Sequence, residues 1–218
     1  MNTDRRWKTI LTDLGTFAAG LAATWFLGWS TRDLLWGMWI CSLVSGFVFF
    51  VGSGVKKLRG QQIGDVIFGT VGLVFGLGFF VLHFGAFHYV QGAMLDLLTP
   101  LEPDPGRVYV GKLTWKGARS FSIFNTVAIA LTKYWALIII TVVHGLLSGI
   151  PDMQDRNEGF RPYIFVLKMH FLMFALAALY AIGLESFPVY VLVLMFFFTP
   201  ASLKLLFAPR KESEPGGA

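Results

Sequence analysis

GDVIFGTVGLVFGLGFFVLHFGAFHYVQGAMLDLL, residues 64–98, is apolar over nearly its whole length. A helix rises about 1.5 Å per residue, so roughly 20 apolar residues cross the hydrocarbon core of a bilayer. This stretch exceeds that length, and Pro100, Pro103 and Pro105 end it. We therefore predict a membrane-spanning helix here, and several further spans on either side of it.

The composition supports an integral membrane protein. The chain has 218 residues, of which 55% are hydrophobic and only 14% charged. Soluble domains carry about 25% charged residues. The 22 Phe and 24 Gly also fit membrane helices, where aromatic residues and glycine are frequent. A soluble domain of this size could not hide several apolar runs of this length.

The net charge of +5 is best explained by basic cytoplasmic loops, so we expect the lipid bilayer and no nucleic acid as partner. Cys41 is the single cysteine, which excludes an internal disulfide and any multi-cysteine metal motif within this chain. Metal binding, if present, would therefore have to use other residue types.

The fold class we predict is all-α, a bundle of six transmembrane helices in one domain, residues 1–207. Residues 99–132 form an external loop followed by an interfacial segment at 119–132, and residues 208–218 form a disordered tail. Ser30 to Asp33 is a polar turn with residues suited to cap the second span. The predicted spans are residues 10–29, 33–54, 64–98, 133–150, 162–183 and 188–207.

Positive charge predicts the orientation of the bundle. Six spans place the N-terminus, the 55–63 loop, the 151–161 loop and the C-terminus on one side, and these segments carry most of the Lys and Arg. Basic loops favour the cytoplasmic side. We therefore predict a multi-pass protein with both termini in the cytoplasm. Lys133 and Lys168 lie near predicted span ends, where we expect them to act as interfacial anchors.

All four histidines lie in apolar stretches, where an ionisable side chain is costly unless it has a partner. His83 follows Gly72 and Gly76 on one helical stripe, which predicts that it faces packed protein. His88 is five residues further on and diverges from His83 by about 140° around the helix axis. The two are thus poor candidates for one shared metal ion.

His144 and His170 lie on consecutive antiparallel spans at similar depth, so they could meet in the cytoplasmic leaflet. His144 shares a polar stripe with Thr141 and Ser148. Three interpretations stay open for these rings: hydrogen bonds to a backbone carbonyl or to Ser or Thr, ligation of a metal ion or haem, and a proton path. Thr141, Ser148, Ser42 and Ser45 are the candidate hydrogen-bonding partners.

Several short runs occur in the order found in a family of bacterial multi-spanning membrane proteins known only as a domain of unknown function, which this chain resembles. The likeness extends over most of the predicted membrane region. The runs are Phe26-Leu27-Gly28-Trp29-Ser30, Leu34-Leu35-Trp36 with Trp39, His83-Phe84-Gly85-x-Phe87, His144-Gly145, and Pro162-Tyr163 with Val166, Leu167 and His170.

The resemblance implies that His83, His144 and His170 occupy positions that recur in that family, and that the membrane is the bacterial inner membrane. The chain departs from the family pattern at Gln91, where a second histidine is expected, and at Cys41-Ser42, where Glu-Asn is expected. If the family positions bind a metal, this chain lacks one or two of its ligands.

Two functional classes remain. In the first, His83, His144 and His170 bind a transition metal ion or haem, with His88, Gln91 and Ser148 around them. In the second, the protein is an accessory or scaffold subunit that packs against other membrane subunits, and its histidines only form hydrogen bonds. The sequence indicates no reaction, so enzymatic activity stays an open question.

Overall fold

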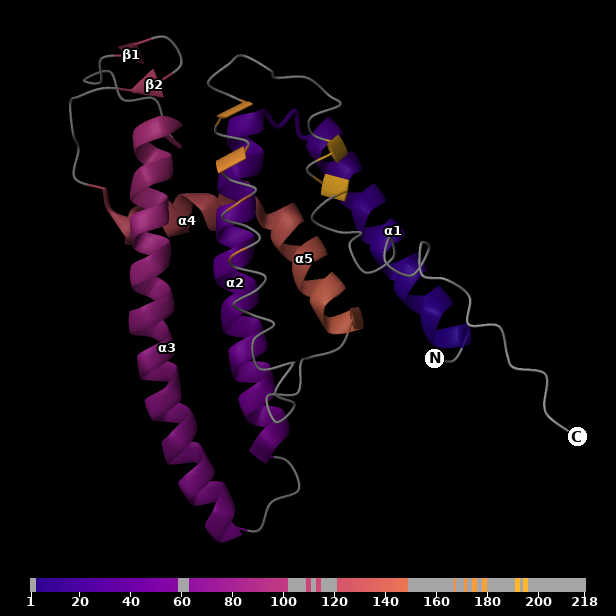
Figure 1. Ribbon diagram of the computed structural model, residues 1–218, viewed down its shortest axis with the longest axis vertical. Helices are drawn as coiled ribbons and strands as arrows, with labels where there is room; N and C mark the ends of the chain where they lie inside the picture. The colour runs from indigo at the N-terminus through magenta and orange to yellow at the C-terminus, as the bar shows by residue number, and fades with distance from the viewer. Residues whose placement is uncertain are drawn as a thin grey trace, which may run out of the picture.

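The computed structural model describes residues 3–58, 63–101, 109–110, 113–114 and 121–148, with a few positions between 167 and 195 (Figure 1). The described part is almost entirely helical, as the sequence predicts. The helices are α1 (Thr3–Phe26), α2 (Thr31–Leu58), α3 (Ile63–Leu98), α4 (Ile123–Lys133) and α5 (Trp135–Ser148). The strands β1 (Tyr109–Val110) and β2 (Leu113–Thr114) pair antiparallel, with Tyr109 opposite Thr114.

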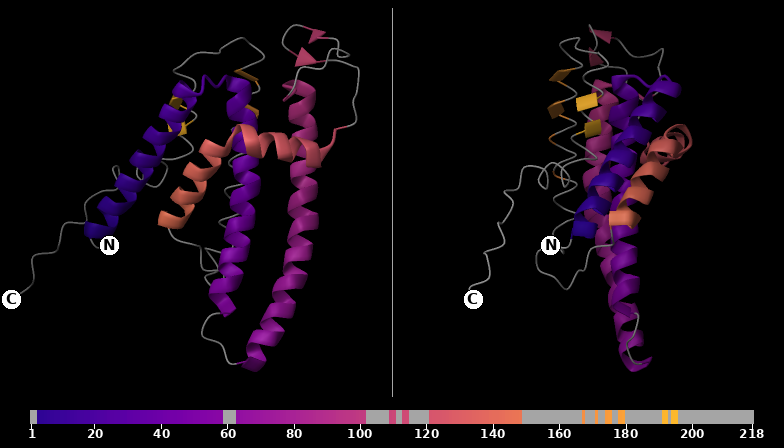
Figure 2. Two further views of the ribbon diagram at one scale, coloured as in Figure 1. Left: turned by 180° about the vertical axis from the view of Figure 1, so that it is seen from behind. Right: turned by 90° about the vertical axis from the view of Figure 1, so that its right-hand side faces the viewer.

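Helix α2 is the centre of the arrangement (Figures 1 and 2). It packs against α3, α4 and α5, while α1 packs against α5. The strand pair lies near the C-terminal end of α3, which β2 contacts. The helices therefore surround α2 on several sides, and the buried residues concentrate on it.

Two helices, α2 and α3, are long and apolar enough to cross a membrane, over Thr31–Lys56 and Gly69–Leu97. A third span exists if α4 and α5 count as one broken span. Helix α1 matches the predicted first span in position but is less apolar, since Asp13 and several threonines lie in it. The predicted fifth and sixth spans lie outside the described residues, so the six-span bundle and its orientation stay predictions.

The turn between α1 and α2 follows from its local sequence. Gly28 has φ +63°, a left-handed conformation that glycine adopts without steric cost. The amide of Trp29 donates to the Thr24 carbonyl and that of Gly28 to the Trp25 carbonyl, which is the Schellman pattern of helix ends. The turn is therefore closed by backbone hydrogen bonds before α2 begins.

Ser30 and Asp33 cap the start of α2 reciprocally, as the polar turn predicts. The Ser30 hydroxyl accepts from the Asp33 amide at 3.3 Å, and the Asp33 carboxylate accepts from the Ser30 amide at 2.9 Å. This is a capping box, which satisfies two amides that helix geometry leaves unpaired. It also leaves the second oxygen of Asp33 directed to another part of the fold.

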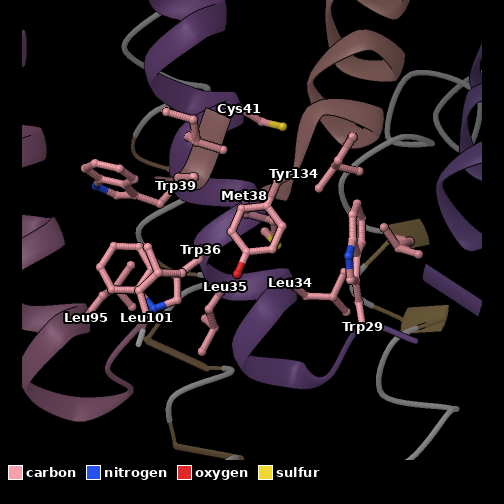
Figure 3. Close-up of a cluster of buried hydrophobic side chains, with 14 residues drawn as sticks. Trp29, Leu34, Leu35, Trp36, Met38, Trp39, Cys41, Leu95, Leu101 and Tyr134 are labelled. Atoms are coloured by element: carbon pink, nitrogen blue, oxygen red, sulfur yellow. The ribbon is translucent and has the colours of Figure 1, made fainter. Parts of the chain in front are cut away.

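The core forms where the N-terminal half of α2 meets α3 and α5 (Figure 3). Trp36 and Trp39 are completely buried and meet edge to face at 5.5 Å. Their indole nitrogens donate to the carbonyls of Thr99 and His88, at 2.7 and 3.1 Å. Both indoles are thus satisfied without water, and both fasten α2 to α3.

Glycines of α2 let its neighbours approach closely. A Cβ at Gly46 would collide with the ring of Phe84, and one at Gly37 would lie 3.0 Å from Leu137. Gly72 of α3, by contrast, has nothing within 4 Å of a Cβ. The predicted contact stripe through Gly72 and Gly76 is therefore only half right, because Gly76 alone meets α2, at Phe50.

We expect Gly46→Val to destabilise the protein by about 1–3 kcal/mol, because the buried Phe84 ring must move to admit the new side chain. The measurement is reversible unfolding in detergent micelles. Gly72→Val on the exposed side of α3 is the matched control and should leave the free energy of unfolding close to that of the parent. Equal effects of the two substitutions would contradict the packing described here.

Candidate functional site

His83 does not face packed protein, contrary to the prediction. Its side chain is exposed and stacks on the ring of Phe79 at 5.6 Å. The face of α3 that meets α2 is set by the large rings Phe80, Phe84 and His88, four residues apart. His83 lies about 100° around the helix from Phe84, which turns it away from α2.

His88 is completely buried and hydrogen-bonded through both ring nitrogens. Nδ1 lies 3.0 Å from the Phe84 carbonyl oxygen, and Nε2 lies 3.3 Å from the Ser42 hydroxyl. A carbonyl oxygen only accepts, so Nδ1 carries a proton, and in the neutral ring Nε2 accepts from Ser42. His88 thus joins α3 to α2 through the hydrogen bond to Ser42.

His144 pairs with Asp13, a contact between α5 and α1 across 131 residues of sequence. The His144 Nε2 and Asp13 Oδ1 atoms are 3.0 Å apart. Asp13 is only 2% exposed and His144 is half-buried. A carboxylate at such burial is costly unless it is paired, and the imidazole supplies one such partner.

Asp13 belongs to the buried face of α1, which repeats at intervals of three and four residues. The threonine hydroxyls on this face donate to carbonyls of their own helix. Thr16 donates to the Thr12 and Asp13 carbonyls, and Thr24 donates to the Gly20 carbonyl. Among the hydrogen bonds described, the Asp13 carboxylate is the one group of this face that contacts another helix. The buried residues of this face are Ile10, Asp13, Thr16, Gly20 and Thr24.

Gly145, next to His144, brings α5 close to α2. A Cβ at this position would lie 3.1 Å from the Phe49 ring. Thr141, one turn earlier, donates its hydroxyl to the Leu137 carbonyl at 2.7 Å. The His144 ring is therefore carried by a helix that close packing holds in place.

A second polar cluster surrounds Asp33. Its Oδ1 lies 2.8 Å from Lys133 Nζ and accepts from the Tyr134 hydroxyl at 3.0 Å, while Oδ2 accepts from the Ser30 amide and hydroxyl. Lys133 is thus not simply an interfacial anchor, because its ammonium group is paired with a carboxylate. Its side chain remains 39% exposed, so water still reaches the pair.

The predicted ligand set is not assembled within the described residues. Among them, no three His, Cys, Asp or Glu side chains are grouped as a metal ion requires. His170 and the side chain of Ser148 lie outside the described residues. Gln91 is buried on α3 one turn after His88, and neither residue contacts His144 in any interaction described.

The sequence analysis missed Asp13 altogether. The signal was present, because Asp13 is the one acidic residue within the predicted first span. An intramembrane carboxylate deserves the same scrutiny as an intramembrane histidine. The identity of its partner was beyond the sequence, because helical periodicity does not show which faces of two distant helices meet.

The chain matches no protein-family model, and no match occurs among the curated proteins or the solved structures. The resemblance to the family of unknown function therefore stays a prediction.

The Asp13–His144 contact can be measured by a double-mutant cycle. We expect Asp13→Asn and His144→Gln each to destabilise the protein, with a coupling energy of about 1–3 kcal/mol between them. The physical reason is that either single substitution already breaks the contact between the two side chains. The second substitution then has no contact left to remove, so the two effects do not add.

Unfolding in detergent of the parent, the two single variants and the double variant gives this coupling energy. A parallel cycle of Asp13→Asn with His83→Gln serves as the control and should be additive, since His83 lies exposed on α3. Additive effects in the first cycle would rule out the pair.

Proposed function

We propose that this chain is a multi-pass protein of the bacterial inner membrane in which Asp13 and His144 form a proton-exchange centre. Buried ionisable residues within membrane helices commonly mark ion pathways and proton relays, and Asp and His are frequent members of such relays. The observation that carries the proposal is the 3.0 Å contact between these two groups on different helices, with Asp13 only 2% exposed.

The chemistry of the pair supports this function. A carboxylate and an imidazole together hold one proton without net charge, whether as an ion pair or as two neutral groups. Gain of a second proton leaves the pair positive, and loss of the first leaves it negative. Each proton gained or lost by the pair would therefore change its net charge by one unit.

The surroundings of the pair also fit a proton-coupled membrane protein. His144 lies on α5, which together with α4 forms a helix pair bent by 83°. Discontinuous helices near buried charged groups are characteristic of transporters.

A metal or haem site is the second candidate. A histidine that ligates a metal usually donates its other ring nitrogen to a carboxylate, and Asp13 on His144 Nε2 has that arrangement. In this alternative His144 and His170 are ligands, Asp13 orients His144, and Ser148 lies nearby. His83 is a weaker candidate than the sequence suggests, because α3 carries its ring on the exposed side.

The accessory-subunit alternative draws on α3. Only 11% of the apolar 18-residue stretch of this helix is buried by the rest of the protein, although the helix is long enough to span a membrane. Lipid or another membrane subunit would have to cover the remainder.

Proton flux into liposomes containing the purified full chain tests the proposal. With a potassium diffusion potential and an internal pH dye, we expect flux above that of empty liposomes. Asp13→Asn and His144→Gln should each lower it at least about tenfold, since proton transfer by positioned groups contributes factors of this order or more. His83→Gln is the matched control and should retain the parental flux.

Absence of flux in the parent, or equal flux in the Asp13→Asn and His144→Gln variants, would refute the proton-exchange function. Metal analysis and an absorption spectrum of the same preparation separate the alternatives. A stoichiometric metal ion or a Soret band lost in His144→Gln favours the metal or haem site. A metal-free protein without flux that co-purifies with fixed partners favours the accessory subunit.

A further inference from the structure

The junction of α4 and α5 is a sharp bend without a sequence cause. The two helices are separated by Tyr134 alone, with φ −109° and ψ 23°, and their axes differ by 83°. Bends of this size usually occur at Pro, at Gly or Ser pairs, or where a group enters the hydrogen-bond ladder. Neither Pro nor Gly occurs between Ile123 and His144.

Few backbone hydrogen bonds cross the junction. Tyr134 donates to the Ala130 carbonyl and Ile138 donates to the Tyr134 carbonyl, at 2.9 and 3.1 Å. Within residues 121–148, the amides of Trp135, Ala136 and Leu137 make no backbone bond to a carbonyl of α4. A continuous helix would supply these three bonds, which are most valuable where water is scarce.

Tertiary contacts on both sides of the bend compensate for the missing bonds. Lys133 and Tyr134 both bind Oδ1 of Asp33, and Ser30 holds Oδ2 of the same carboxylate. Asp33 therefore ties the last residue of α4 and the junction residue to the first turn of α2. The Asp33 side chain is only 10% exposed, although water reaches the ion pair at the 39% exposed side chain of Lys133.

The ring of Tyr134 is seated in the core (Figure 3). Tyr134 is completely buried and meets Trp29 edge to face at 5.6 Å. A Cβ at Gly37 would lie 3.6 Å from its ring, so the glycine leaves room for it on α2. The bent form thus depends on the packing of this ring against Trp29 in the α1–α2 turn and against the first turns of α2.

We propose that Tyr134 is a hinge, held in the bent form by the Asp33 carboxylate, and that Ile123–Ser148 becomes one continuous helix when this contact is lost. The straight helix would be about 39 Å long, sufficient to cross the roughly 30 Å hydrocarbon core of a bilayer. Joined, α4 and α5 are apolar enough for a single span. The hinge does not require the proton-exchange function, although it would move the helix that carries His144.

The proposal goes beyond the observed bend because it assigns two stable conformations to one segment. In the bent form the side-chain contacts of Asp33 with Lys133 and Tyr134 offset the cost of the three missing backbone bonds. In the straight form the backbone bonds are complete, while Asp33 and Lys133 separate. Each form satisfies its polar groups differently, as a two-state element requires.

Spin labels at Phe124 and Leu146 measure the bend, because both side chains are exposed, at 87% and 54%. The full chain in lipid nanodiscs, with Cys41→Ala to remove the native thiol, is the sample for pulsed dipolar spectroscopy. Helix geometry places the labelled backbone positions about 25 Å apart in the bent form and about 33 Å apart in the straight form. We expect the shorter distance in the parent and the longer one in Asp33→Asn.

Tyr134→Phe removes one hydroxyl without changing the shape of the ring, so it should shift part of the population even if Asp33→Asn folds poorly. His83→Gln, at an exposed position of α3 away from the junction, is the control and should retain the short distance. The hinge is wrong if Asp33→Asn and Tyr134→Phe both keep the parental distance. It is equally wrong if the parent already shows the long one, or if His83→Gln lengthens it as much as Asp33→Asn.

Discussion

Asp33 is the point at which three parts of the fold are joined. Its carboxylate caps α2 through Ser30, pairs with Lys133 at the end of α4, and accepts the hydroxyl of Tyr134 before α5. A charge at this burial requires several partners, and those partners come from segments about 100 residues apart in the chain. The positions of α4 and α5 relative to α2, and hence the place of His144, depend on this group.

The two buried carboxylates of the described residues, Asp13 and Asp33, have partners of different chemistry. Asp33 is held by a lysine, a tyrosine and a serine, and its role is to fix the geometry of a turn and a bend. Asp13 meets an imidazole, a group that can both accept and donate a proton. Similar burial therefore accompanies a bent helix junction in one case and a candidate reactive centre in the other.

Hydropathy and capping rules predict much of the local structure. The long apolar helices α2 and α3 and the capped turn at Ser30 follow from apolar length and polar interruptions. The side of α3 on which His83 lies was predicted wrongly, since small residues mark contact faces less reliably than the rings Phe80, Phe84 and His88. The Asp13–His144 pair escaped prediction because it depends on tertiary packing between the first and fifth helices.

The indoles of Trp36 and Trp39 have a mechanical consequence. They donate to the carbonyls of His88 in α3 and of Thr99 directly after it, about 16 Å apart along the helix axis. Sliding of α3 along α2 would break both hydrogen bonds at once. It would leave two buried indole N–H groups without an acceptor. Sliding of α3 along α2 is therefore unfavourable. Among the described helices, larger movements are expected in α1, α4 and α5.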